Sequence, residues 1–264
     1  MTPMRSAVCL LIPLLSLGSL VLSCSQKGEA PTATASPAAP VSEPAKPAER
    51  IAAPAGPKGS VFGVVLLTGT APKPEALQRS SDPVCAKTEA VDETILSKGG
   101  KLQNVVVRVV EAVPGALPPD PVVVDQQGCM YRPRVQAAMR GQRLQIRNSD
   151  GTLHNIHSYE GMKTGFNLAQ PPGAQGVERP LGAQVPVVKL KCDVHPWMTG
   201  YIVLSDHPYF ATTAEDGSFK IEGLPPGKYT LEAWHEKLGT QKTAVTVAPD
   251  AVTKTELKFA TDPP

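Results

Sequence analysis

The residues best suited to bind a metal ion are a cysteine, a histidine and a methionine within seven positions of one another. Cys192, His195 and Met198 occupy the turn between two segments that we expect to be strands. A thiolate, an imidazole and a thioether on one short loop can converge on a single ion, and soft sulfur ligands favour copper. A second imidazole must come from elsewhere, and His154, in residues 147–155, is the candidate. These residue types predict one mononuclear copper site.

Each of these residues also has a simpler explanation. Cys192 suits half of a disulfide, His195 suits a surface position, and Met198 suits core packing, which is the commoner fate of a lone methionine. The complete ligand set in this order favours the metal over three separate explanations. The histidines near the C-terminus, His207 and His235, are expected at surface or packing positions.

His157 is the alternative to His154 as the upstream ligand. Residues 154 and 157 of a strand point to opposite faces, so only one of the two histidines should face the metal. We favour His154 because it directly follows a turn and precedes Asn155. His157 and Glu160 also form a His-x-x-Glu pair of the kind that binds zinc, but so short a pattern is frequent by chance.

The elements that must position these residues are short strands. From residue 59 onward, segments rich in β-branched residues alternate with turn signals such as Asp216-Gly217. Many short strands with regular turns are typical of sandwiches and barrels, and only residues 74–80 suggest helical periodicity. We therefore predict an all-β fold. Its strands are expected at residues 61–67, 105–110, 122–124, 143–147, 185–190, 201–204, 210–213, 218–221, 229–234, 243–247 and 253–259.

Composition argues against several classes of protein. The 28 prolines and 22 glycines, with only 19% charged residues, argue against a coiled coil or a helical array. A formal net charge of +2 without a basic run argues against a nucleic-acid partner. The apolar stretches stay below the roughly 18 residues of a membrane-spanning helix, which argues against a multi-span membrane protein.

The first residues have the pattern of an export signal. Arg5 is the only charge before residue 24, an apolar run follows it, and Val-Leu-Ser-Cys at 21–24 resembles a bacterial lipobox. The resemblance implies that residues 1–23 are a signal peptide and that Cys24 carries a lipid, with ordinary signal cleavage nearby as the alternative. Residues 24–58, rich in Ala and Pro, are expected to be a disordered linker. The protein would then be exported, and lipid-anchored at the periplasmic face of a membrane or at the cell surface.

The cysteines can be assigned by counting. Of five cysteines, Cys9 leaves with the signal peptide and Cys24 takes the lipid, so three remain. An exported compartment permits a structural disulfide, but three thiols cannot all pair. Only Cys192 has His and Met close by, so we predict a disulfide between Cys85 and Cys129 and a metal thiolate at Cys192. The alternative pairs Cys192 with one of the other two.

Two motifs near the C-terminus follow a family pattern. They are Thr-Ala-Glu-Asp-Gly-Ser-Phe at 213–219 and Gly-Leu-Pro-Pro-Gly-Lys-Tyr-Thr-Leu at 223–231. Together they resemble the carboxypeptidase regulatory-like domain, a small transthyretin-like β-sandwich. The opening strand of that family, Gly-x-Val-x-Gly-x-Val, is matched far upstream by residues 59–65. We therefore expect a discontinuous sandwich of residues 59–118 plus 208–260, with residues 119–207 inserted as a second domain.

The inserted segment carries a second family pattern. It contains Tyr-x-Pro at 131–133, Gly-x-x-Leu-x-Ile-x-Asn at 141–148, His-Asn-Ile at 154–156 and then the Cys-x-x-His-x-x-Met loop. In this order the motifs resemble the cupredoxins, Greek-key β-sandwiches or barrels that hold blue type 1 copper. The loop spacing and Pro196 are amicyanin-like within this plastocyanin-like group. Lys191 departs from the pattern, because an aromatic or apolar residue often precedes the cysteine.

The cupredoxin resemblance implies roles for individual residues. It implies four ligands to one copper ion: His154, Cys192, His195 and Met198. Asn155 matches the position whose side chain supports the ligand loop. In this family the loop histidine reaches the surface through an apolar patch. His195, Pro196 and Trp197 would then form the electron-exchange surface.

The resemblance also implies a function. We expect a membrane-anchored, exported blue-copper protein that transfers single electrons and is not itself an enzyme. Its partner would be a redox protein, either a dehydrogenase or a cytochrome, and the chain is expected to be a monomer that meets the membrane only through its lipid. Two alternatives remain open: a copper-binding or buffering module without redox turnover, and a structural, partner-binding β-sandwich lipoprotein.

Overall fold

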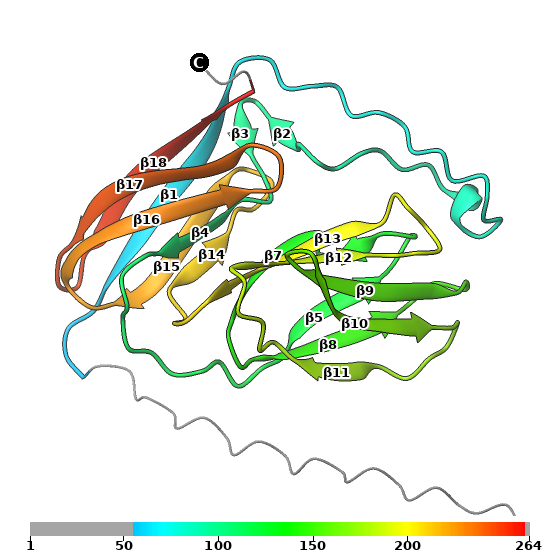
Figure 1. Ribbon diagram of the computed structural model, residues 1–264. Helices are drawn as coiled ribbons and strands as arrows, with labels where there is room; N and C mark the ends of the chain where they lie inside the picture. The colour runs from blue at the N-terminus through cyan, green and yellow to red at the C-terminus, as the bar shows by residue number, and fades with distance from the viewer. Residues whose placement is uncertain (1–54, 262–264) are drawn as a thin grey trace, which may run out of the picture. The chain divides into compact units, whose positions relative to one another are not determined.

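The regular elements of the described chain are β-strands and one short 3-10 helix (Figure 1). The computed structural model describes residues 55–261. The predicted signal peptide (1–23), the predicted lipid-anchor residue Cys24 and all but the end of the predicted linker (24–58) lie outside the described residues. Within residues 55–261, no helix has the length and apolar character needed to cross a membrane. The predicted all-β fold is confirmed.

The strands fall into three consecutive groups along the chain. The first group is β1 (Gly59–Thr68), β2 (Ser97–Lys98), β3 (Lys101–Leu102) and β4 (Val106–Val109), with the helix η1 (Cys85–Lys87) between β1 and β2. The second is β5 (Val122–Gln126), β6 (Tyr131–Arg132), β7 (Val135–Met139), β8 (Arg143–Asn148), β9 (His154–Glu160), β10 (Lys163–Gln170), β11 (Val177–Pro180), β12 (Val187–Lys191) and β13 (Thr199–Ser205). The third is β14 (Phe210–Thr212), β15 (Ser218–Leu224), β16 (Gly227–His235), β17 (Gly239–Val247) and β18 (Val252–Ala260).

The first and third groups share one pair of sheets. One sheet has the order β15-β1-β3-β2, with β18 also paired to β1, and the other has the order β14-β4-β16-β17. β1 pairs antiparallel with β15 and parallel with β18. Side chains that alternate along these strands meet in one core, which contains Val61, Leu102, Val107, Leu231 and Phe259. Strands from residues 59–118 and from residues 208–260 thus build the same sandwich.

The second group forms another pair of sheets. Their orders are β10-β9-β12-β13-β7 and β11-β8-β5-β6, so the chain crosses repeatedly from one sheet to the other. The core between these sheets contains Leu144, Ile156 and Ile202, together with Cys192 and Met198. The predicted ligand loop is therefore anchored in a packed core and is not a free surface loop.

The segment between β1 and β2 differs from its predicted structure. Residues 74–80, where the sequence suggested helical periodicity, are extended: Ala76 bridges Val91, and the Leu77 N–H donates to the Ala90 carbonyl oxygen (2.9 Å). The helical periodicity suggested for residues 74–80 was wrong. Apolar spacing over so few residues does not outweigh pairing with another extended segment.

A small apolar cluster joins the two sandwiches. Val106 of β4, Val135 of β7 and Val203 of β13 are buried against one another. Trp234 packs on Tyr201, with ring centroids 5.4 Å apart. Alternation along β16 turns Trp234 away from the core of its own sandwich and toward this cluster.

A buried ion pair lies near this cluster. Arg134, between β6 and β7, donates to Glu236 after β16 (Nη2–Oε2 2.8 Å), and their side chains are only 7% and 4% exposed. Burial alone would lower the pKa of Arg134, but the hydrogen bond and charge of Glu236 raise it. The guanidinium is thus charged and paired.

The two histidines of unassigned role are packing residues. His207 is buried, and its Nε2 lies 3.1 Å from the Val109 carbonyl oxygen. His235 is also buried, and its Nδ1 accepts from the N–H groups of Lys237 and Leu238 (3.2 Å each). Both imidazoles therefore contact backbone groups, His207 on the neighbouring strand β4 and His235 within its own turn.

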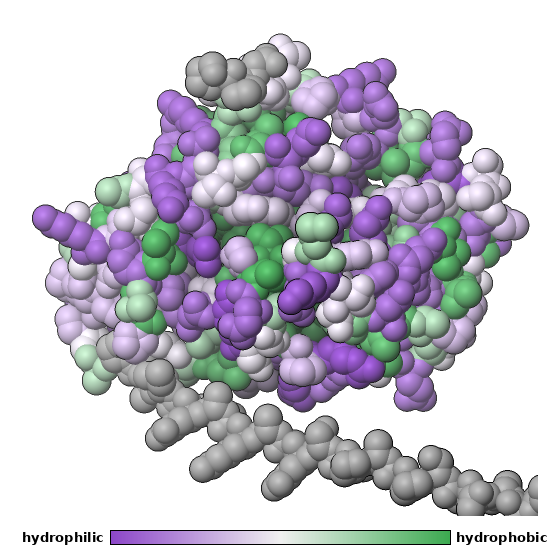
Figure 2. Space-filling view, in the orientation of Figure 1, coloured by the Kyte–Doolittle hydropathy of each residue, from purple (hydrophilic) through white to green (hydrophobic). Residues whose placement is uncertain are grey.

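The surface has a mixed character. On the face drawn in Figure 2, hydrophilic residues surround separate hydrophobic groups. Among the large hydrophobic side chains, Leu153 is 45% exposed and Val194 is 48% exposed. Leu153 directly precedes His154 in the chain, and Val194 lies inside the predicted ligand loop.

Candidate metal centre

Strand pairing brings the predicted ligand segments together. β12 and β13 form an antiparallel pair, and residues 192–198, the ligand loop, connect them. Within the loop, the Cys192 N–H donates to the Met198 carbonyl oxygen (3.3 Å) and the Met198 N–H donates to the His195 carbonyl oxygen (2.9 Å). β9 pairs with the other edge of β12 and begins at His154.

Three side chains meet in a buried cluster. The Nδ1 atoms of His154 and His195 lie 2.9 Å apart, and the Cys192 Sγ lies 3.7 Å from the His195 Nδ1. Each of these residues is at most 2% exposed. Within residues 55–261, Cys192 is the one free cysteine. Met198 is fully buried in the same core, so all four predicted ligand residues lie in this region.

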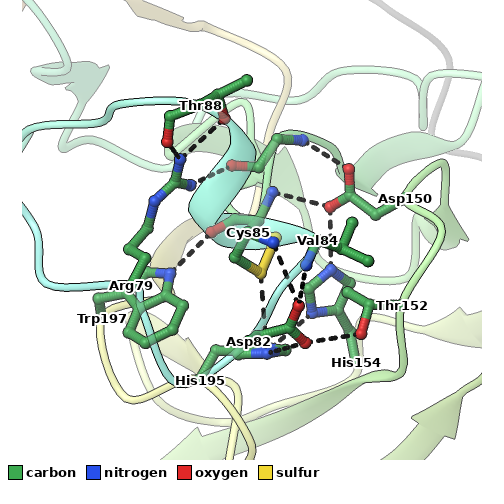
Figure 3. The surroundings of a disulfide bond; sticks show 12 residues. Arg79, Asp82, Val84, Cys85, Thr88, Asp150, Thr152, His154, His195 and Trp197 are labelled. Carbon is green, nitrogen blue, oxygen red and sulfur yellow. Dashed lines mark hydrogen bonds and ion pairs between the residues drawn. A yellow bond between two sulfur atoms is a disulfide. The ribbon is translucent and has the colours of Figure 1, made fainter.

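Two carboxylates hold the outer nitrogens of the histidines. The Asp150 Oδ2 lies 2.9 Å from the His154 Nε2, and the Asp82 Oδ2 lies 3.0 Å from the His195 Nε2 (Figure 3). Because an ionised carboxylate only accepts hydrogen bonds, each neutral ring carries its proton on Nε2. The two Nδ1 lone pairs then face each other at 2.9 Å. Such a pair is stable only with a proton or a metal ion between the nitrogens.

The donor set fits copper. Two imidazole nitrogens, one thiolate and a weak thioether are the ligands of mononuclear copper electron-transfer sites. Burial lowers the pKa of His154, and although its hydrogen bond to Asp150 raises the pKa, the net shift is downward. A lowered pKa favours the neutral imidazole that metal binding requires. The residue types present therefore suit a copper ion, and the lowered pKa of His154 favours the form that can bind it.

Asn155 fastens the ligand loop to β9. Its Oδ1 accepts from the Asp193 N–H (2.6 Å), and its Nδ2 donates to the Asp193 carboxylate (2.9 Å). Its backbone N–H points at the Cys192 Sγ (3.5 Å). Burial alone would raise the pKa of Asp193, but hydrogen bonds from Asn167, His157 and Asn155 lower it. The carboxylate is thus kept ionised beside the loop.

His157 points away from the cluster. Its Nδ1 lies 3.1 Å from the Asp193 carboxylate, and its Nε2 lies 2.9 Å from the Thr164 Oγ1. Its ring stacks on Tyr159, with centroids 4.2 Å apart. His154 and His157 therefore lie on opposite faces of β9, as expected for residues three positions apart in a strand.

A disulfide joins Cys85 to Cys129. Cys85 belongs to η1, and Cys129 lies in the turn between β5 and β6, where Gly128 (φ 64°) and Cys129 (φ 55°) both have positive φ. Two positive φ values in succession are typical of the tight turns that match strand twist, and glycine adopts them readily. Both cysteines are buried. The bond links residues 59–118 to residues 119–207.

A short piece of the β1–β2 connection covers His195. We call residues 79–88 the cap segment. Besides the disulfide, Arg79 holds it by donating to the Gly128 carbonyl oxygen (2.6 Å), and Asp82 holds it by accepting from the Thr152 hydroxyl (2.7 Å). The His195 Nε2 lies 3.8 Å from the Cys85 Sγ as well as facing Asp82.

The predicted electron-exchange surface is wrong at His195. Its imidazole is 1% exposed because the cap segment occupies the space outside it. Trp197 is partly buried: its ring packs on His195 with centroids 5.0 Å apart, and its Nε1–H donates to the Cys129 carbonyl oxygen (3.0 Å). Of the three predicted residues, only Pro196 is exposed.

Sequence reasoning missed the two aspartates. Asp150 lies four residues before His154 in the same turn, so a local carboxylate beside a ligand histidine was a usable signal. Asp82 lies 113 residues from its partner His195, on a segment without a recognisable motif. No local pattern connects those two residues.

Comparisons with known proteins were made on sequence and on structure. The family model of the carboxypeptidase regulatory-like domain matches residues 201–260. No curated protein sequence matches the chain. Similar solved structures include a purple cupredoxin from Nitrosopumilus maritimus, with 23% identity over 32% of this chain and 99% of that chain, at a TM-score of 0.28.

Two other solved structures have similar scores. A mutant of amicyanin, in its Cu(I) form, has 19% identity over 38% of this chain and 98% of that chain, at a TM-score of 0.29. The copper-containing nitrite reductase from Thermus scotoductus SA-01 has 21% identity over 37% of this chain and 25% of that chain, at a TM-score of 0.27. Both families that the sequence resembled thus recur among the matches.

Proposed function

We propose that this chain binds one copper ion with its four predicted ligand residues and carries single electrons instead of catalysing a reaction. The observation that supports this most is the facing pair of Nδ1 lone pairs on His154 and His195, with the Cys192 thiol beside them. Both Nε2 atoms are already committed to carboxylates. Bound copper supplies a one-electron Cu(I)/Cu(II) couple.

The chain itself contributes a buried set of metal-ligand side chains held in fixed positions. β9, β12 and β13 hold the two ligand segments, and the Asn155 side chain ties these segments together. The ligand side chains are buried in or beside a packed core, and close-packed cores resist rearrangement. A site that keeps one arrangement in both oxidation states suits electron transfer, because little must move when the charge changes.

Visible and EPR spectra after adding Cu(II) to the purified metal-free protein test this proposal. We expect an intense blue thiolate-to-copper band and narrow copper hyperfine splitting. C192S removes the band because the thiolate is lost. H154A and H157A form a matched pair on one strand: H154A loses the blue spectrum and H157A keeps it. A colourless wild-type protein, or a pale one with ordinary hyperfine splitting, would overturn the proposal.

One observation favours a second candidate function, a copper-holding module without rapid electron exchange. The cap segment leaves His195 only 1% exposed, so the imidazole edge is closed to a partner. Measuring the self-exchange rate by NMR line broadening between Cu(I) and Cu(II) protein separates the two functions. Rapid exchange supports the electron carrier, and very slow exchange with reversible metal release supports copper holding.

Export, anchoring and partners are further parts of the proposal. The signal-peptide pattern and lipobox support an exported protein attached to a membrane through Cys24, and mass spectrometry of the N-terminal peptide detects or excludes its lipid. A redox protein, a dehydrogenase or a cytochrome, would dock near the ligand loop. The exposed side chains of Leu153, Val194 and Pro196 offer apolar contact there. A monomeric carrier fits this arrangement.

A further inference from the structure

Asp150 connects one half of the disulfide to one ligand imidazole. Its Oδ2 accepts from the Cys129 N–H (2.8 Å) and lies 2.9 Å from the His154 Nε2. Its Oδ1 accepts from the Gly128 N–H (2.8 Å). Backbone N–H groups of the β5–β6 turn therefore hold the Asp150 carboxylate in place. The carboxylate in turn holds the ring of His154.

Asp82 connects the other cysteine of the disulfide, Cys85, to the second ligand imidazole, that of His195. Its Oδ1 accepts from the N–H groups of Val84 (2.7 Å) and Cys85 (3.1 Å). Its Oδ2 accepts from the Thr152 hydroxyl (2.7 Å) and lies 3.0 Å from the His195 Nε2. In Figure 3 the carboxylate of Asp82 lies between the cap segment and the ring of His195.

The two halves have the same design. In each, a carboxylate accepts from the backbone N–H of a disulfide cysteine and binds the Nε2 of a ligand histidine. The disulfide links the two cysteines whose N–H groups hold these carboxylates. Each carboxylate thus makes one contact to the disulfide and one contact to a ligand ring.

We propose that Asp82 and Asp150 are positioning residues of the copper site. This inference rests on the proposed function and extends the site beyond residues 119–207, because Asp82 belongs to the cap segment. Each carboxylate fixes the ring orientation and makes the imidazole a stronger donor. A stronger donor stabilises Cu(II) more than Cu(I), since the ion of higher charge gains more. The cap segment therefore tunes the metal and does not merely cover it.

D82N in the full chain tests this inference, because it removes the charge and nearly keeps the shape. We expect a 10- to 100-fold loss of Cu(II) affinity in competition with a chelator. The loss for Cu(I) should be smaller, so the reduction potential rises, by about 59 mV for each tenfold difference between the two losses. The blue band is retained because the ligands are unchanged. D206N is the matched control, since Asp206 is 77% exposed and pairs with Arg140.

T152V separates positioning from simple attachment of the cap segment. The variant loses the hydroxyl that donates to Asp82 but keeps the carboxylate on His195. We expect it to lower stability slightly and leave the potential near that of the wild type. If D82N leaves both affinity and potential unchanged, or if T152V shifts the potential as far as D82N, the inference is wrong.

NMR of the metal-free protein makes the test independent of copper. The Nε2–H of His195 should be visible and slow to exchange in the wild type, and D82N should accelerate its exchange. If D82N accelerates this exchange but the wild type shows no blue spectrum with copper, the positioning of the His195 ring by Asp82 is retained and the proposed function is rejected. A blue wild type whose Nε2–H exchanges as fast as that of D82N would reject the positioning role alone.

Discussion

The direction of two imidazole rings decides what the cluster can do. His154 and His195 both turn Nδ1 inward and Nε2 toward a carboxylate. Their residue types and that of Cys192 were predictable from spacing, since all three belong to short motifs. The ring orientation was only half predictable. Asp150 is four residues from His154, but Asp82 is brought to His195 by the fold alone.

Replacing Asn155 with alanine should loosen the ligand loop. N155A leaves the Asp193 N–H without its acceptor and removes the amide donor to the Asp193 carboxylate. We expect a 10- to 100-fold loss of copper affinity, by analogy with other contacts that support metal ligands. Chelator competition measures it. N167A is the control, because Asn167 is exposed and donates to the same carboxylate without reaching the loop backbone. Equal losses in the two variants would contradict this role for Asn155.

Two of the strands that escaped prediction are β9, which carries part of the site, and β10, which lies at the edge of its sheet. β9 buries His154, Asn155 and Ser158 beside Ile156, so most of its buried positions are polar and do not indicate a strand. β10 is largely exposed, and its burial alternates only in its second half, at Phe166, Leu168 and Gln170. By contrast, β1 and β18 alternate clearly and were predictable from their β-branched residues. When a strand places polar ligand residues at buried positions, it loses the alternation of apolar and polar residues by which strands are recognised in a sequence.

Removing the disulfide should release the cap segment. In the double variant C85S/C129S the covalent closure of a segment of 44 residues is lost. The chain-entropy relation gives about 4 kcal/mol less unfolding free energy for a loop of this length. Denaturant titration measures the loss. We also expect His195 to become accessible to solvent, which the hydrogen exchange of its ring N–H reports. Unchanged exchange would mean that the contacts of Arg79 and Asp82 suffice to hold the segment.

At the scale of the whole molecule, sequence reasoning found the classes of module but not the contacts between them. The turn motifs and the opening strand at residues 59–65 indicated a sandwich made from distant segments. The cluster of Val106, Val135 and Val203 and the ion pair of Arg134 with Glu236 carry no such signal. Isolated valines and charges are common, and only the three-dimensional arrangement gives these five residues a shared role.

Stability should fall in mild acid because of His235. Burial, together with the charge of Arg134, lowers the pKa of this imidazole from 6.5 to about 4. The unfolded chain therefore binds the proton more readily, so the stabilising contribution is complete above pH 6.5 and is lost as the pH falls toward 4. The contribution is about 3 kcal/mol. H235N keeps an acceptor for the following N–H groups but does not titrate.

Unfolding free energies of the wild type and H235N between pH 4 and pH 7 check this prediction. The variant should show a shallower decline, with the difference confined to the interval below pH 6.5. His154 and His207 also have lowered pKa values, so some decline should remain in the variant. Identical slopes in the two proteins would show that His235 does not contribute.

The chain leaves the first sandwich after β4 and returns to it at β14. These strands are antiparallel neighbours, with Arg108 opposite Phe210, and the Val109 N–H donates to the Tyr209 carbonyl oxygen (3.1 Å). The two ends are thus one strand spacing apart, a gap that a two-residue turn closes. The strands of residues 119–207, which hold the proposed metal site, are therefore an insert whose two ends lie close enough for a short turn to join them. Apart from the backbone itself, the Cys85–Cys129 disulfide is the covalent bond within residues 55–261 that removing the insert would break.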